Sequence, residues 1–177
     1  MTILLFLFIL AYFFQSELYR LHPDKAITEP QENILWQEAA QSLSTSDVPV
    51  GALIIYDDTI LSTGHNTVLP DSNVAAHAEI NAINNAIRKI GFESFSKLDR
   101  KKLILVSTFE PCQMCQGAIN EYHILHTSFM KGKGIYHWLK NDAQQFRYEW
   151  NRRQSEGEEK QDSLFMLHPK FRQQNQK

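Results

Sequence analysis

Residues 102–115 read KLILVSTFEPCQMC, an apolar run followed by a proline and two cysteines. A continuous apolar run of this length is expected in a central strand that helices cover on both faces, so the sequence predicts a strand over Lys102–Thr108. A helix is expected to start around Cys112, just after Pro111, and to run to about Tyr122. The strand and the helix after it give the chain an α/β character.

Segments with clear periodicity surround this strand. Helices are expected where apolar residues recur every three or four positions, and strands where β-branched residues run between turn residues. The expected elements are a helix from Thr28 to about Leu43, a hairpin of strands over Val50–Tyr56 and Thr59–Thr63, a helix over Ala75–Ile90 and a strand over His123–Phe129. Helices that alternate with the later strands predict a mixed sheet with helices on both faces.

The composition is that of an ordinary soluble protein. The chain has 177 residues, of which 43% are hydrophobic and 21% are charged, and its formal net charge is −2. This charge gives no general attraction to nucleic acid or acidic lipid, so a polyanionic partner would need a local basic patch. We expect an apolar N-terminal segment with its linker over residues 1–27, a main domain over 28–150 and a polar C-terminal extension over 151–177.

An uncharged apolar run occupies Ile3–Phe14. As a helix it would span roughly 18 Å, against the ~30 Å of a bilayer core. Two interpretations remain open: a membrane anchor, or a helix that packs on the domain or on a second copy of it. A cleaved signal peptide is disfavoured, since no basic residue precedes the run. Arg20 and Lys25 follow it, so the main domain is expected in the cytoplasm, with or without attachment to the membrane.

The two cysteines, Cys112 and Cys115, are the only ones in the chain. A disulfide between them would close so small a loop that it would remove little chain entropy. The pair is therefore redox-active or a pair of metal ligands. His77-Ala78-Glu79 marks the start of another expected helix. One histidine with two cysteines is a catalytic zinc set, because the fourth tetrahedral position stays open for water. Glu79 is well placed to transfer protons.

These two motifs together resemble the signature of the zinc nucleobase deaminases, H-x-E followed by P-C-x-x-C. Further stretches resemble the branch that contains tRNA adenosine deaminases and guanine deaminases, and the likeness runs from about Ile34 to Phe129. These stretches are Asp47–Ala52, Gly64–Asn66, Ala76–Ile80 and Glu110–Ala118. The resemblance implies a three-layer α/β/α cytidine deaminase-like fold with about five strands in its sheet.

The family's chemistry implies roles for single residues. His77, Cys112 and Cys115 would hold Zn²⁺, which lowers the pKa of a water. Glu79 would take a proton from that water and return it to a ring nitrogen and the exocyclic amine, so that ammonia leaves. Asn66 occupies the position whose side chain helps to hold the base or sugar in the family. Family members commonly form dimers, so a homodimer is expected.

The substrate side of the family pattern is altered here. Where tRNA adenosine deaminases usually carry His-Ser-Arg after the cysteines, this chain has Glu121-Tyr122-His123. An acidic residue there disfavours phosphate binding, so we expect a free base, nucleoside or nucleotide, with purines slightly favoured, over tRNA. Two other interpretations remain: a deaminase-like interaction module with secondary or no catalysis, and a thiol redox protein. The redox interpretation leaves His77-Ala78-Glu79 without a role.

Overall fold

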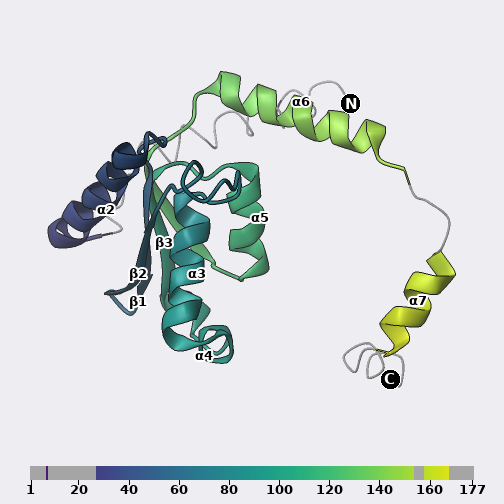
Figure 1. Ribbon diagram of the computed structural model, residues 1–177, viewed down its shortest axis with the longest axis horizontal. Coiled ribbons are helices and arrows are strands. Elements are labelled where there is room, and N and C mark those ends of the chain that lie inside the picture. The colour runs from purple at the N-terminus through teal and green to yellow at the C-terminus, as the bar shows by residue number, and fades with distance from the viewer. Residues whose placement is uncertain (1–6, 8–26, 154–157, 168–177) are drawn as a thin grey trace. The chain divides into compact units, whose positions relative to one another are not determined.

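The computed structural model describes Leu7 and residues 27–153 and 158–167 (Figure 1). The chain divides into two compact units, one up to Lys133 and one from Gly134. The expected boundaries at residues 27 and 150 stay predictions. The apolar run over residues 3–14 lies outside the described residues, apart from Leu7. Among the helices of the described part, none is both long enough and apolar enough to cross a bilayer.

The first unit is built on a sheet with the strand order β2-β1-β3-β4. Its strands are β1 (Gly51–Tyr56), β2 (Thr59–His65), β3 (Leu103–Phe109) and β4 (His126–Lys131). β1 is antiparallel to both β2 and β3, whereas β4 is parallel to β3. The sheet is therefore mixed, as expected. It has four strands within the described residues, fewer than the five or so expected, because the chain after β4 continues into a helix.

Helices cover both faces of this sheet. Figure 1 shows α2 (Glu29–Gln41) on one face, and α3 (Ala78–Ile90) and α5 (Gln113–Glu121) on the other. A shorter helix, α4 (Phe92–Ser96), follows α3, and two 3-10 turns lie at Ser42–Thr45 and Arg100–Lys102. The predicted α/β/α layering is confirmed.

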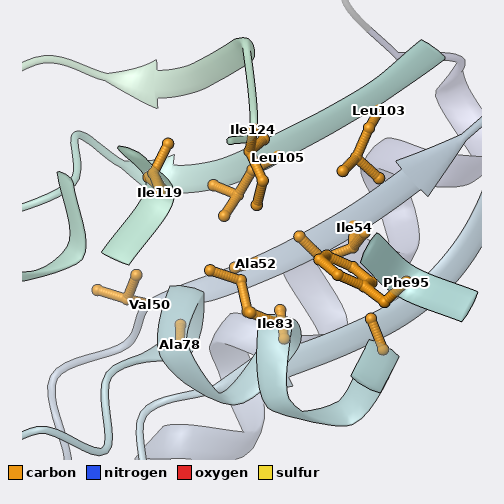
Figure 2. Packing of buried hydrophobic residues seen from close by; sticks show 12 residues of the cluster. Val50, Ala52, Ile54, Ala78, Ile83, Phe95, Leu103, Leu105, Ile119 and Ile124 are labelled. Carbon is orange, nitrogen blue, oxygen red and sulfur yellow. The ribbon is translucent and has the colours of Figure 1, made fainter. Parts of the chain in front are cut away.

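Two apolar clusters hold the layers together, because the continuous apolar strands β1 and β3 face a helix on each side. The larger cluster lies under α3 and α5, and Figure 2 shows Ile54, Ile83, Phe95 and Leu105 meeting there. The smaller one lies under α2 and joins five buried residues: Ile27, Leu35, Leu53, Ile55 and Val106. Both faces of β1 and β3 are therefore buried.

The free edge of β2 is covered by side chains of α3. Residues four positions apart on this helix lie on one face, and each donates to an alternate carbonyl of the strand. The pairs are Asn81 with His65, Asn85 with Thr63 and Lys89 with Leu61, at 2.8, 2.8 and 2.9 Å. These bonds satisfy acceptors that an edge strand would otherwise offer to another chain, and they hold α3 in register with β2.

Gly64 lets β2 approach α3 closely. A Cβ at this position would lie 2.4 Å from the backbone N of Ala82 and 2.6 Å from the carbonyl O of Ala78. We expect Gly64→Ala to lower the free energy of unfolding by about 1–3 kcal/mol, because the backbones must separate to accept the methyl group. Urea unfolding measures this loss.

Gly117, on α5, is the matched control, because a Cβ there would have nothing within 4 Å. Gly117→Ala is expected to be neutral or to stabilise the protein by up to about 1 kcal/mol. Equal unfolding free energies for Gly64→Ala and the unchanged protein would show that the close approach of β2 to α3 is not tight.

The second unit consists of α6 (Ile135–Asn151) and α7 (Glu158–Leu167). The aromatic spacing over residues 136–150 predicts a partly buried helix. The helix is confirmed by α6, but the predicted burial is wrong, because Tyr136 and Tyr148 are exposed on it. Leu139, Phe146 and Trp150 on α6 are exposed, and the rings of the last two stack at a centroid distance of 6.0 Å. The polar stretch over Asn151–Gln161 is expected to be a solvated loop, but α7 already begins at Glu158. Glutamate and lysine there are good helix formers, which explains the earlier start.

Candidate metal centre

Two helix starts present the residues with metal-ligand chemistry. His77 is the N-cap residue of α3, with an extended backbone at φ −79° and ψ 155°, and Cys112 is the N-cap residue of α5. Neither side chain caps its own helix. A residue at an N-cap commonly bonds the first backbone N–H groups of its helix, so both side chains are left available for another role.

The side chains of the two helix starts converge. Nδ1 of His77 lies 3.6 Å from Sγ of Cys112 and 3.6 Å from Sγ of Cys115, and the two sulfurs are 3.5 Å apart. Tetrahedral zinc with bonds of about 2.0–2.3 Å places its ligand atoms about 3.5 Å from one another. The donor set and its spacing therefore fit Zn²⁺. Within the described ranges this is the one cluster of three potential ligands.

The environment favours a thiolate in this cluster. The hydrogen bond between the two sulfurs, with a further contribution from His77, lowers the pKa of Cys112 to about 3. The same bond favours the protonated form of Cys115, and its pKa is raised for that reason and by burial. The pKa of His77 is also raised, chiefly by its bond to Cys112. A charged sulfur at the cluster is the form that binds a metal ion.

Glu79 lies beside the cluster and away from solvent. Its side chain is 4% exposed, and its Oε2 lies 3.5 Å from Sγ of Cys115. Burial raises the pKa of the Glu79 carboxyl above its ordinary value, because desolvation disfavours the charged form. A buried carboxyl with a raised pKa can both accept and return a proton near neutral pH.

Asn66 lies at the end of β2, next to the start of α3. Its side-chain O accepts the N–H of Ala78 at 2.8 Å, and its side-chain N donates to the carbonyl of Val48 at 2.8 Å. The residue is only 7% exposed. The structure thus brings all the residues expected from the sequence to one region, with Asn66 in contact with the backbone between His77 and Glu79.

Lys133 is a residue near the centre that the sequence did not single out. It is 7% exposed, its backbone N–H donates to Oε2 of Glu110 at 2.6 Å, and its ammonium lies 5.6 Å from the ring centre of Phe109. Its charge also acts to lower the pKa of His77. No local signal identifies this lysine, because it follows β4, far along the chain from the motifs.

Comparison with known proteins gives a family match. The profile described as "Cytidine and deoxycytidylate deaminase zinc-binding region" matches residues 31–131, which include both motifs. Among curated proteins, the tRNA-specific adenosine deaminase of Streptococcus pyogenes serotype M18 is 36% identical over 93 residues, or 52% of this chain and 55% of that protein. The tRNA-specific adenosine deaminase 2 of Xenopus tropicalis is 37% identical over 87 residues, or 48% of this chain and 50% of that protein.

Solved structures show the same likeness. A structure from a study of A-to-I editing by tRNA:A34 deaminases at the wobble position has a TM-score of 0.52 and 28% identity, and the match covers 58% of this chain and 70% of that one. Guanine deaminase from Bacillus subtilis has a TM-score of 0.52 and 25% identity, with 71% and 78% covered.

The match spans about half the length of these curated relatives. The profile match, over residues 31–131, contains both motifs and more than half of this chain, with β1 to β4 and the helices between them. From the profile match and the convergence of His77, Cys112 and Cys115, it follows that the chain belongs to the family of the cytidine and deoxycytidylate deaminase zinc-binding region.

Proposed function

We propose that this chain is a zinc-dependent hydrolytic deaminase. It would replace the exocyclic amine of a nucleobase, nucleoside or nucleotide with a carbonyl, consuming water and releasing ammonia. The observation that carries the proposal is the position of the buried Glu79 carboxyl beside the cluster of His77, Cys112 and Cys115. A redox pair of cysteines needs neither the histidine nor the carboxyl, so hydrolysis accounts for more of the site.

Each residue has a distinct task in this proposal. His77, Cys112 and Cys115 would hold the zinc ion, and when bound this ion lowers the pKa of water and so supplies a nucleophile near neutral pH. Glu79 accepts one proton from the attacking water and passes it to the ring nitrogen, then carries the second proton from the new hydroxyl group to the amine, which leaves as ammonia. Its burial keeps bulk solvent from competing for that proton.

We propose that a free purine base, nucleoside or nucleotide is a better substrate than RNA. The names of the relatives include both tRNA-specific adenosine deaminases and a guanine deaminase, which favours purines. The helix α5 ends at Glu121, which is exposed and acidic. A negative charge at this place disfavours binding of a phosphate backbone. Adenosine-to-inosine deamination of tRNA is the second candidate, favoured by the names of the curated relatives.

The test of the substrate is ammonia release from a panel of guanine, adenine, cytosine, their nucleosides and a tRNA anticodon stem-loop. The proposal predicts turnover of a free purine or its nucleoside at a higher kcat/KM than that of the stem-loop. Turnover of the stem-loop alone would establish the second candidate. Ammonia release from none of them, by protein that carries zinc, would contradict the proposal and favour an interaction module.

We further propose that the protein is a cytoplasmic homodimer. We also propose that residues 3–14 bind either a membrane or protein. The apolar composition of that run supports a contact with lipid or with a second copy. Deletion of residues 1–14 is expected to leave a soluble, active domain if the run binds lipid. If the run instead packs on protein, the shortened chain should aggregate, and sedimentation of both forms with and without vesicles distinguishes these results.

A further inference from the structure

The start of α3 lacks the usual cap. The first turn of a helix has backbone N–H groups without partners inside the helix, and the N-cap side chain commonly accepts from one of them. His77 occupies this position but makes no such bond, because its ring faces the two sulfurs. The first turn therefore depends on an acceptor from elsewhere in the fold.

Asn66 supplies that acceptor from the end of β2. Its side-chain O accepts the N–H of Ala78, the first residue of α3, at 2.8 Å. Ala78 lies between His77 and Glu79 in the chain. Any shift of its backbone moves both the proposed ligand and the proposed proton carrier.

Asn66 is itself held from several sides. Its side-chain N donates to the carbonyl of Val48, and its backbone N–H bonds the carbonyl of Val50 and Oγ of Ser42. The distances for these three bonds are 2.8, 3.2 and 3.1 Å. The acceptor is thus fixed by the segment before β1 and not by α3 alone. A rigid anchor of this kind is what a precisely placed ligand requires.

We propose that Asn66 is a positioning residue that caps the first turn of α3 from a neighbouring strand and so fixes His77 and Glu79. This positioning role is separate from the contact with substrate that the family resemblance implies for Asn66, and it rests on the metal centre proposed above. The side-chain O is bonded to Ala78 and one side-chain N–H to Val48, so the side chain is held in the orientation that the positioning role requires.

Zinc affinity separates the two roles. Asn66→Leu removes the acceptor but keeps the branched shape and the number of heavy atoms, and it is expected to weaken zinc binding about 10–100-fold, the usual effect of losing an outer partner of a ligand. Competition with a chromophoric chelator measures this affinity. If Asn66→Leu binds zinc as the unchanged protein does and only raises KM, Asn66 is a substrate ligand and the proposal is overturned.

Two further variants control for effects on folding. Asn85→Leu removes a similar bond, from the side-chain N of Asn85 to the carbonyl of Thr63 at 2.8 Å, farther along α3. Its zinc affinity is expected to stay within about 2-fold of the unchanged protein. Asn66→Asp keeps an oxygen acceptor, and we expect it to bind zinc more tightly than Asn66→Leu. An equal loss of zinc affinity in Asn85→Leu and Asn66→Leu would show a general loosening of α3 and contradict the proposal.

Amide hydrogen exchange tests the cap without metal or substrate. In the unchanged protein the N–H of Ala78 should exchange as slowly as amides in the middle of α3, because it has an internal acceptor. Exchange at the rate of an unbonded amide would overturn the proposal even if Asn66→Leu failed to fold. A protein that binds no zinc would refute the proposed function, whereas the exchange rate of Ala78 would still decide the role of Asn66.

Discussion

Glu79→Gln is expected to bind zinc like the unchanged protein and to lose turnover by about 10²–10⁴-fold, the usual contribution of a general acid–base group. Glutamine keeps the shape of the buried side chain but cannot accept a proton from water. The effect should fall on kcat, because the proton transfers belong to the chemical step and not to substrate binding. Metal analysis and steady-state ammonia release, on the same preparation, measure both quantities.

Glu38 offers the matched control for this variant. Its carboxylate is also largely shielded, and it accepts from Oγ1 of Thr63 at 2.7 Å and lies 3.0 Å from Nδ1 of His65, without contact with the metal cluster. Glu38→Gln is expected to retain most of the turnover, although it weakens the link between α2 and β2. Substantial activity in Glu79→Gln would show that Glu79 is not the proton carrier.

His77→Ala and Cys112→Ser are each expected to lose zinc and, with it, all measurable turnover. Each removes one of three protein ligands, so the loss of affinity should exceed the 10–100-fold that follows loss of an outer partner. The control is His126→Ala, because His126 is an exposed residue of β4 outside the cluster. Zinc content per chain, measured after dialysis, compares the three variants.

Zinc content also tests the redox interpretation. A thiol redox protein would be isolated without zinc, and Cys112 and Cys115 would form a disulfide that titrates reversibly with reductant. His77→Ala would leave that titration intact. Zinc retained in His77→Ala and Cys112→Ser at the level of the unchanged protein would show that the metal lies elsewhere.

Local patterns predicted most of the fold. β1, β2 and β3 appear where β-branched and apolar runs predict them, since the runs are long and turn residues bound them. The predicted helix over Ala75–Ile90 begins three positions late, at Ala78. The carbonyl of Ala76 accepts the N–H of Thr67 from outside the helix, and His77 has an extended backbone, so α3 starts only at Ala78.

The start of the last strand was also predicted too early from the local pattern. It was expected over His123–Phe129 but begins at His126. His123 adopts φ 53°, and the N–H of Ile124 bonds the carbonyl of Ile119 at 3.0 Å, so these residues close α5 before the strand can start. Such helix endings depend on tertiary context and carry little sequence signal here, because no glycine marks the turn.

The candidate site was predictable to the extent that it is encoded in short motifs. The two motifs taken together, with the family resemblance that they carry, indicated Cys112, Cys115 and His77 with Glu79, because metal ligands recur in local patterns. The bond from Asn66 to Ala78 and the burial of Lys133 were not predictable, since each depends on segments that the fold brings together.

The most direct test of the metal centre is to measure ammonia release from the preferred substrate before zinc is removed, after it is removed with a chelator, and after zinc is added back. Activity is expected to disappear with the metal and to return in full with about one zinc ion per chain, as a single site of three protein ligands requires. Turnover that persists in zinc-free protein would show that His77, Cys112 and Cys115 do not hold a catalytic metal.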